Sequence, residues 1–213
     1  MIDGQLREVL QRPLRWGAAR VDVRGITPNG LTGLGLVVGL ASAALAAFQL
    51  WWLALAAWLI SRVLDGLDGA LARRRQSKGD AEGSDQPASE LGGFLDIVAD
   101  FTVYGATVFG VAIGVTNGFG ASWWPFLLVL LSYYLNGAAF LAFSSIAERT
   151  GRQIDDGRSL SFLGRLAEGT ETIVVHSLWL IFPTVASQTA VVWAAFVLIS
   201  AAERVFRGTR LLR

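Results

Sequence analysis

Apolar residues fall into six long stretches along the chain, and polar residues collect in the segments between them. The stretches lie at about 29–50, 51–73, 91–116, 123–147, 160–183 and 187–206. Each is close to the ~20 residues that a helix needs to cross the hydrocarbon layer of a bilayer. The pattern predicts an all-α integral membrane protein with six transmembrane helices, folded as a single domain over residues 1–213.

Ahead of the first stretch, residues 1–26 form an arm that mixes apolar and basic side chains. Leu10 and Leu14 share this arm with Arg15, and it lacks the short apolar core of a secretory signal peptide. The mixture predicts an amphipathic helix on the membrane surface, interrupted or restarted at Pro13. The alternative interpretation is a disordered basic tail.

The basic residues indicate how the helices are oriented. The turns between the first and second, third and fourth, and fifth and sixth stretches contain no Lys or Arg. Basic residues collect instead in the arm, in the connections after the second and fourth stretches, and at the C-terminus. The positive-inside rule then places both termini in the cytoplasm, with the Trp51–Trp52 and Trp123–Trp124 pairs at the outer interface. We expect the cytoplasmic (inner) membrane of a bacterium or archaeon.

The composition supports this class and excludes others. Hydrophobic residues make up 53% of the 213 positions and charged residues only 16%, whereas about a quarter of a soluble domain is charged. Because the chain has no Cys, it has no disulfide, thiol nucleophile or thiolate metal site. The net charge is only +1, and we expect no nucleic-acid partner.

Two pairs of aspartates interrupt the apolar stretches. Asp65 and Asp68 lie in the second stretch, and Asp96 and Asp100 lie early in the third. A carboxylate in the apolar layer is costly and indicates function, and spacings of three and four residues place each pair on one helix face. Because a cytoplasmic connection joins the two helices, all four acids can converge near the inner surface. Their mutual repulsion favours a bound hard divalent cation, Mg²⁺ or Mn²⁺.

Glycines and an arginine accompany these acids. Gly66 and Gly69 flank the first pair, Gly92 and Gly93 precede the second, and Arg73 follows near the inner interface. Small residues allow helices and phosphate groups to approach closely, and an arginine can bind a phosphate bidentately. Metal and cation together are what phosphoryl chemistry requires. The alternative is that the acids lie near a helix end and merely pair with basic neighbours, Arg62 and residues 73–75.

The same residues resemble a family signature. Asp65-x-x-Asp68-Gly69-x-x-Ala72-Arg73, followed by Gly92-x-x-x-Asp96-x-x-x-Asp100, is similar to the motif of the class I CDP-alcohol phosphotransferases (CDP-alcohol phosphatidyltransferases). The stretch at 27–32, which opens the first span, resembles the usual start of that family. Six helices behind a surface helix also agree with its fold, so the resemblance covers most of the chain.

The resemblance implies a metal-dependent transferase of phospholipid biosynthesis. It would move a phosphatidyl group from CDP-diacylglycerol to an alcohol and release CMP. Asp65, Asp68, Asp96 and Asp100 would bind one or two Mg²⁺ or Mn²⁺ ions, and Asp100 would also be the general base. The resemblance further implies a homodimer and a CDP site formed by Gly69, Ala72 and Arg73, with Asn29 and Thr32 added from the first helix.

One departure from the family pattern is the connection between the two halves of the motif. Residues 74–91 are more numerous than the family's usual connection and are rich in polar residues, Gly and Ser. They predict a flexible cytoplasmic loop. Such a loop would leave the motif intact and could reshape the entrance to the site.

The acceptor alcohol is less clearly indicated. Members of the family that use inositol phosphate hold it with arginines in the fifth helix, where this chain has Gly169 and Thr172. This difference favours a neutral or zwitterionic small alcohol. A phosphorylated acceptor (glycerol 3-phosphate or inositol phosphate) and a lipid alcohol stay open as alternatives. The candidate acceptor residues are Arg149, Arg152, Arg165, Glu168 and Glu171.

Other classes of membrane protein also place acids in the bilayer. A transporter with buried carboxylates would not require the D-x-x-D-G-x-x-A-R pattern. An intramembrane prenyltransferase binds a metal diphosphate through two aspartate clusters, but such proteins are larger and their clusters are denser in acid. The chain's single histidine, His176, lies mid-span among apolar neighbours, which predicts an interhelical hydrogen bond rather than a catalytic role.

Overall fold

A computed structural model describes residues 2–81, 90–150 and 169–212 of the chain. In these ranges every regular element is helical, as the apolar pattern predicts. The elements are α1 (Ile2–Val21), α2 (Pro28–Ala47), α3 (Trp51–Ala81), α4 (Glu90–Phe119), α5 (Trp124–Arg149), α6 (Gly169–Ile181), the short 3₁₀ helix η1 (Pro183–Val185) and α7 (Ala186–Leu211).

Four segments are long and apolar enough to cross a membrane: Pro28–Ala47, Glu90–Phe119, Trp124–Ala147 and Pro183–Leu211. They confirm a helical integral membrane protein. The second predicted span corresponds to α3, whose apolar part contains Arg62, Asp65 and Asp68 and is therefore too charged to count on composition alone. The described part of the fifth span is α6, which has 13 residues. The full count of six spans stays a prediction.

Two of the predicted local features are wrong. Helix α3 continues to Ala81, so the first part of the 74–91 connection is helical rather than a loop. Residues 82–89 lie outside the described ranges. Helix α1 runs without a break through Pro13, which is exposed, so water can satisfy the carbonyl group that the missing N–H leaves free. The alternative of a disordered arm is also excluded for residues 2–21.

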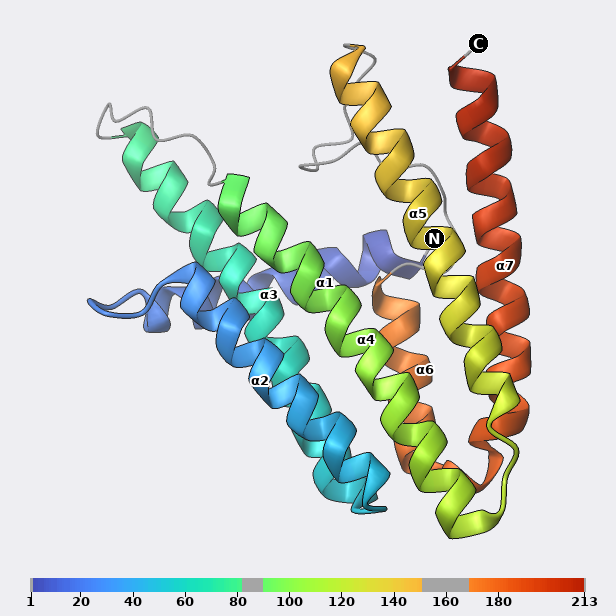
Figure 1. Ribbon diagram of the computed structural model, residues 1–213. Coiled ribbons are helices and arrows are strands. Elements are labelled where there is room, and N and C mark those ends of the chain that lie inside the picture. The colour runs from blue at the N-terminus through green and yellow to red at the C-terminus, as the bar shows by residue number, and fades with distance from the viewer. Residues whose placement is uncertain (1, 82–89, 151–168, 213) are drawn as a thin grey trace.

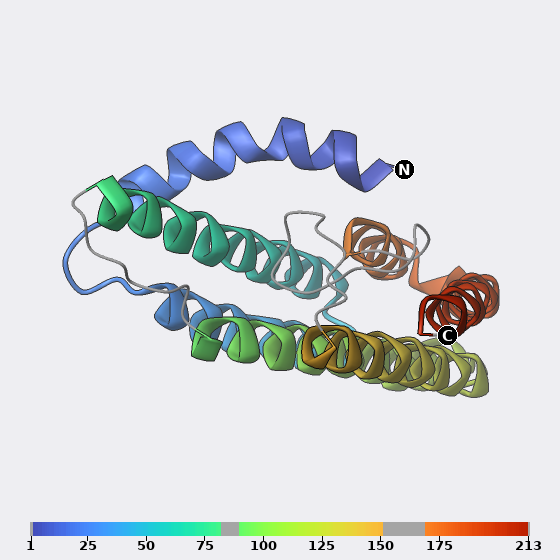
Figure 2. The same cartoon turned by 90° about the horizontal axis from the view of Figure 1, so that it is seen from above.

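The long helices form a splayed bundle, and α1 lies across it (Figures 1 and 2). Helix α2 packs against both α3 and α4, while α5 packs against α7. Helix α6 contacts α3 on the other side of the bundle. The α2–α3 and α4–α5 connections and η1 lie together at one end, the lower end in Figure 1. The C-terminal end of α3 and the N-terminal end of α4, the two helices that carry the aspartates, point the other way.

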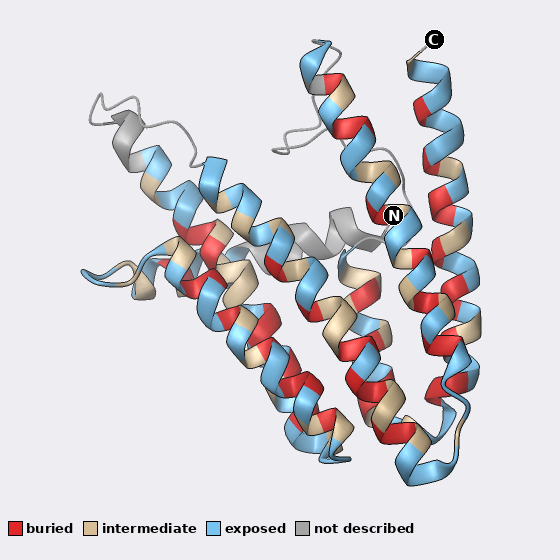
Figure 3. Ribbon diagram, viewed as in Figure 1, coloured by how far each residue is buried: buried red, intermediate tan, exposed pale blue. Residues whose placement is uncertain are grey.

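Buried residues follow the faces on which the helices meet, and the outward faces are apolar and exposed (Figure 3). The core contains Trp58, Phe126 and Trp179 and a row of valines on α4. Glycines bring α2 and α4 close together: a Cβ at Gly110 would strike the carbonyl oxygen of Ala43. Exposed apolar side chains on the outer faces are what a lipid environment requires.

The start of α2 and the end of α1 are held by polar contacts. The Thr27 hydroxyl accepts a hydrogen bond from the backbone N–H of Gly30 at 3.0 Å, which caps α2. Asp22, just after α1, accepts hydrogen bonds from Nε of Arg75 at 3.0 Å and Nε of Arg74 at 3.2 Å. These bonds connect the cross-lying arm to the charged end of α3.

Candidate active site

The two aspartate pairs face a common region from α3 and α4. Nη1 of Arg62 lies 3.8 Å from Oδ1 of Asp65 and donates a hydrogen bond to Oδ1 of Asp100 at 2.5 Å. One guanidinium group therefore joins an acid of α3 to an acid of α4. Asp68 and Asp96 lie one helical turn from Asp65 and Asp100, on the same faces of α3 and α4. The structure therefore brings Asp65 of α3 and Asp100 of α4 to one guanidinium group, and the convergence of all four acids on a metal stays a prediction.

Asp68 is the most deeply buried of the four acids. Only 6% of its surface is exposed, and its Oδ2 accepts a hydrogen bond from the Thr32 hydroxyl of α2. Thr32 also donates to the backbone oxygen of Pro28 at 3.2 Å. The structure thus brings Thr32 into contact with the acid site, while Asn29 lies half-buried at the start of the same helix.

Arg73 lies over a glycine on its own helix. A Cβ built at Gly69 would be 3.2 Å from Nη1 of Arg73, so the missing side chain leaves space for this guanidinium. Arg73 is exposed and interacts electrostatically with Asp96. Ala72 beside it is also exposed. The glycine, the alanine and the arginine of the motif therefore form an open surface next to the acids.

The sequence pattern indicates Arg62 only as a basic neighbour that can pair with the acids, whereas the structure places it between Asp65 and Asp100. It is 8% exposed. Its Cζ lies 5.2 Å from the ring centroid of Trp58 and 5.0 Å from that of Tyr104, and its Nη2 donates to the Ser61 hydroxyl at 3.1 Å. The available signal was its position: an arginine within an apolar stretch is as costly as an aspartate there.

The donor chemistry of the site fits a hard divalent cation, because carboxylate oxygens are the preferred ligands of Mg²⁺ and Mn²⁺. In the described ranges, no three His, Asp or Glu side chains come close enough together to surround one ion. The Arg62 guanidinium instead supplies positive charge between Asp65 and Asp100. The acids of the two helices are neighbours, but their carboxylate groups are too far apart to bind one ion together.

The predicted acceptor residues are only partly within the described ranges. Arg152, Arg165 and Glu168 lie outside them. Arg149 is exposed in the last turn of α5. Glu171 lies in the first turn of α6, and its Oε2 is buried without a hydrogen-bond partner among the described residues. A Cβ on Gly169 would be 3.9 Å from the Tyr104 hydroxyl, which places the start of α6 beside the acid site.

An aromatic cluster lies next to Arg62 and includes the predicted histidine contact. The hydroxyl of Tyr133 on α5 is 2.9 Å from Nε2 of His176 on α6 and accepts a hydrogen bond from Nε1 of Trp193 on α7 at 2.7 Å. The His176 ring lies 5.1 Å from Trp58 and 4.9 Å from Trp179. The interhelical hydrogen bond of His176 is therefore confirmed.

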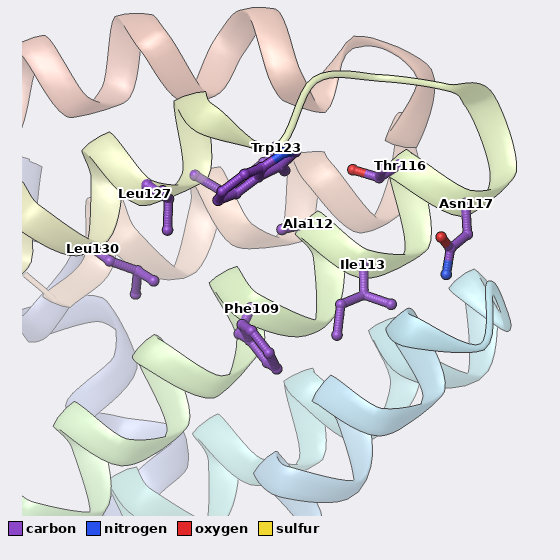
Figure 4. A pocket seen from close by; sticks show the side chains of 9 residues that line it. Phe109, Ala112, Ile113, Thr116, Asn117, Trp123, Leu127 and Leu130 are labelled. Carbon is purple, nitrogen blue, oxygen red and sulfur yellow. The ribbon is translucent and has the colours of Figure 1, made fainter.

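A separate hollow lies between α4 and α5, near the end that carries the tryptophan pairs (Figure 4). It has a volume of about 260 Å³, and its lining contains no charged residue. It therefore differs from the acid site, where carboxylate and guanidinium groups meet. Its lining residues are Phe109, Ala112, Ile113, Thr116, Asn117, Trp123, Phe126, Leu127 and Leu130.

Sequence comparison places this site within a known family signature. The family model for CDP-alcohol phosphatidyltransferases matches residues 25–201. The chain is 34% identical to the "Inner membrane protein YnjF" of Escherichia coli over 98% of its own length and 95% of that protein. It is also 34% identical to an archaetidylinositol phosphate synthase of Pyrococcus horikoshii, over 52% of this chain and 53% of that enzyme.

Solved structures share the fold. The phosphatidylinositol phosphate synthase PgsA1 of Mycobacterium tuberculosis, with CDP-DAG bound, superposes with a TM-score of 0.65 at 20% identity. The match covers 93% of this chain and 92% of that one. The same enzyme in complex with manganese and citrate also gives a TM-score of 0.65, over 93% of this chain and 88% of that one.

Proposed function

The chain belongs to the CDP-alcohol phosphatidyltransferase family, and from this premise we propose that it moves a phosphatidyl group from CDP-diacylglycerol to a small alcohol with release of CMP. Its membership of an enzyme family removes the transporter and prenyltransferase alternatives. The observation that carries the proposal is that Arg62 bridges Asp65 of α3 and Asp100 of α4, which joins the two halves of the aspartate motif. The CDP-DAG complex of the mycobacterial synthase supports the choice of donor.

Asp65, Asp68, Asp96 and Asp100 would hold one or two divalent cations, Mg²⁺ or Mn²⁺. The oxygen-only donor set supports this assignment, as does the manganese complex of the mycobacterial synthase. Bound there, the metal would neutralise the diphosphate of the donor and stabilise the departing CMP.

The remaining steps belong to side chains of this protein. Arg73, exposed over Gly69, would bind a donor phosphate, with Ala72 beside it leaving room for the nucleotide. Thr32 and Asn29 would complete this side of the site from α2. Asp100 would take the proton of the acceptor hydroxyl as its oxygen attacks the phosphorus and the bond to CMP breaks.

For the acceptor, we propose a neutral or zwitterionic small alcohol. The start of α6 lies beside Tyr104 at the acid site, and it presents Gly169, Glu171 and Thr172 there rather than arginines. A buried carboxylate oxygen on Glu171 favours hydroxyl or ammonium donors over a phosphate.

A phosphorylated acceptor is the second candidate. Its support comes from the names of two relatives, an archaetidylinositol phosphate synthase and a phosphatidylinositol phosphate synthase. The sequence assigns Arg149, Arg152 and Arg165 to such an acceptor. Of these three, only Arg149 lies within the described ranges. The two candidates differ in charge, so they can be separated directly by experiment.

We further propose that the chain crosses the membrane six times as a homodimer, with both termini and the acid site on the cytoplasmic side. The distribution of Lys and Arg supports this orientation. So does the position of the uncharged turns, which lie together at one end of the molecule (Figure 1), whereas the acids lie near the middle of α3 and in the first half of α4.

An acceptor panel tests the proposed function. Purified protein is incubated with CDP-diacylglycerol, Mn²⁺ and single acceptors: serine, glycerol, inositol, glycerol 3-phosphate, inositol phosphate or a lipid alcohol. Lipid mass spectrometry and CMP release are measured, with the Asp68→Asn protein as the inactive control. We expect a new phospholipid with an uncharged or zwitterionic acceptor; product from phosphorylated acceptors alone would establish the second candidate instead.

A further inference from the structure

Arg62 is buried among side chains of several helices, unlike an arginine in an ion pair on the surface. It comes from the middle of α3, is 8% exposed, and makes its shortest contact across to α4, the 2.5 Å hydrogen bond to Oδ1 of Asp100. The same Nη1 atom is 3.8 Å from Oδ1 of Asp65. A buried arginine that bridges acids of two helices is fixed by both.

The rest of the guanidinium is held by groups that carry no charge. Trp58 and Tyr104 lie 5.2 and 5.0 Å from Cζ, within the range of cation–π attraction. The Ser61 hydroxyl accepts from Nη2 at 3.1 Å, and is itself held by the backbone oxygen of Gly35 at 2.7 Å. The position of Arg62 is thus determined by α2, α3 and α4 together.

This arrangement uses one oxygen of Asp100 and leaves the other available. The hydrogen bond goes to Oδ1, so Oδ2 can face a metal or the proton of an acceptor hydroxyl. A carboxylate tethered at one oxygen by a fixed donor has a defined orientation, and orientation of the reacting group is a large part of catalytic rate. Arg62 also adds positive charge among four acids that repel one another.

We propose that Arg62 is a positioning residue of the transferase: its guanidinium orients Asp100 for proton transfer and balances the charge of Asp65 and Asp100. The role of Asp100 rests on the proposed function. Arg62 contacts neither reactant and acts through Asp100. The positive charge of Arg62 offsets the repulsion between the acids, so the site keeps its shape without a divalent cation. The same charge weakens the attraction between the acids and such a cation.

A double-mutant cycle tests the proposal. The kcat for CMP release is compared for the wild type, Arg62→Gln, Asp100→Asn and the double variant, together with the Kd for Mn²⁺ measured by electron paramagnetic resonance. Arg62→Gln is expected to lower kcat about 100-fold, with the double variant no slower than Asp100→Asn. Mn²⁺ is expected to bind Arg62→Gln about tenfold more tightly, because a nearby positive charge is gone.

Three results would overturn the proposal. They are a kcat of Arg62→Gln within about threefold of wild type, losses in the double variant that multiply as for independent sites, and unchanged or weaker Mn²⁺ binding. The last result is also what general damage to the site would produce. If the wild type itself releases no CMP, the proposed function and the orienting role fail together, and the Mn²⁺ comparison decides only whether Arg62 balances the charge of the acids.

Arg204→Gln is the matched control. Arg204 is likewise buried, at 4% exposed, and lies 5.3 Å from the Phe140 ring, but it belongs to α7, which packs against α5. Its loss should leave the Mn²⁺ affinity and kcat unchanged. If Arg62→Gln does not purify as a folded protein, Arg62→Lys is used in the same cycle, because it keeps the charge but loses the planar fork. For this variant the Mn²⁺ affinity is expected to stay unchanged, and the kcat values of the cycle decide.

Discussion

Each of the four acids has its own surroundings, and these separate their roles. Asp68 is buried and bound by Thr32, so it is held within the packing of α2 against α3. The side chain of Asp100 is 30% exposed and is bonded to Arg62. A buried and fixed acid suits a ligand that shapes the site, whereas a partly exposed acid can reach an incoming hydroxyl.

The two acids should therefore respond differently to loss of charge. Asp100→Asn is expected to keep metal and CDP binding but to lower kcat about 100-fold or more, because the general base is gone. Asp68→Asn should lose binding and turnover together. The affinities of both variants for Mn²⁺ and CDP, measured together with their rates of CMP release, test this difference.

Glu203→Gln is the control for these two variants, since Glu203 pairs with Arg207 on the surface of α7. Near wild-type turnover by Asp100→Asn would remove the general-base assignment. Intact metal binding by Asp68→Asn would show that the buried acid is not a ligand.

At the scale of elements, α2 sets the distance between the two helices that carry the acids. It packs against both α3 and α4, and glycines on the facing surfaces allow close approach. A Cβ on Gly39 would lie 2.6 Å from Val103 and 2.9 Å from the Ser61 hydroxyl. A Cβ on Gly110 would strike the backbone of Ala43, which has less freedom to move than a side chain.

Gly110→Ala should therefore destabilise the protein, even though alanine is the better helix former. We expect a loss of about 1–3 kcal/mol in the free energy of unfolding, the usual effect of overpacking. Unfolding in detergent micelles with increasing denaturant measures it. Gly105→Ala, on the same helix with its nearest neighbour at 4.0 Å, should be neutral or stabilising; equal loss in both variants would contradict the packing argument.

The sequence predicted the elements better than their ends. Apolar length and the costly acids located α3 and α4 and placed Asp65 and Asp100 on facing surfaces. The extension of α3 to Ala81 was missed because polar and small residues predict a loop, although contacts such as those of Asp22 with Arg74 and Arg75 can hold them in a helix. The place of Arg62 depends on three helices at once, which a linear pattern does not contain.

At the scale of the whole molecule, the acids are set away from the end that carries the aromatic anchors. Asp65 and Asp68 lie near the middle of α3, and Asp96 and Asp100 lie in the first half of α4, while the α2–α3 and α4–α5 turns lie together at one end (Figure 1). The arm α1 crosses the bundle and is connected through Asp22 to the charged end of α3 (Figure 2). Such a difference between the two ends of the molecule is required of a site that receives its substrates from one side of the membrane.

Because the chain contains no Cys, single cysteines can test this orientation. Gln49→Cys and Ser122→Cys place a thiol in the two uncharged turns, and Ser77→Cys places one on the exposed polar end of α3. A membrane-impermeant maleimide added to intact cells should label the first two proteins and reach the third only after lysis. The reverse pattern would put the acids on the outer side, away from cytoplasmic acceptors and from the CMP pool, and a transferase facing outward would need its nucleotide-linked donor on that side too.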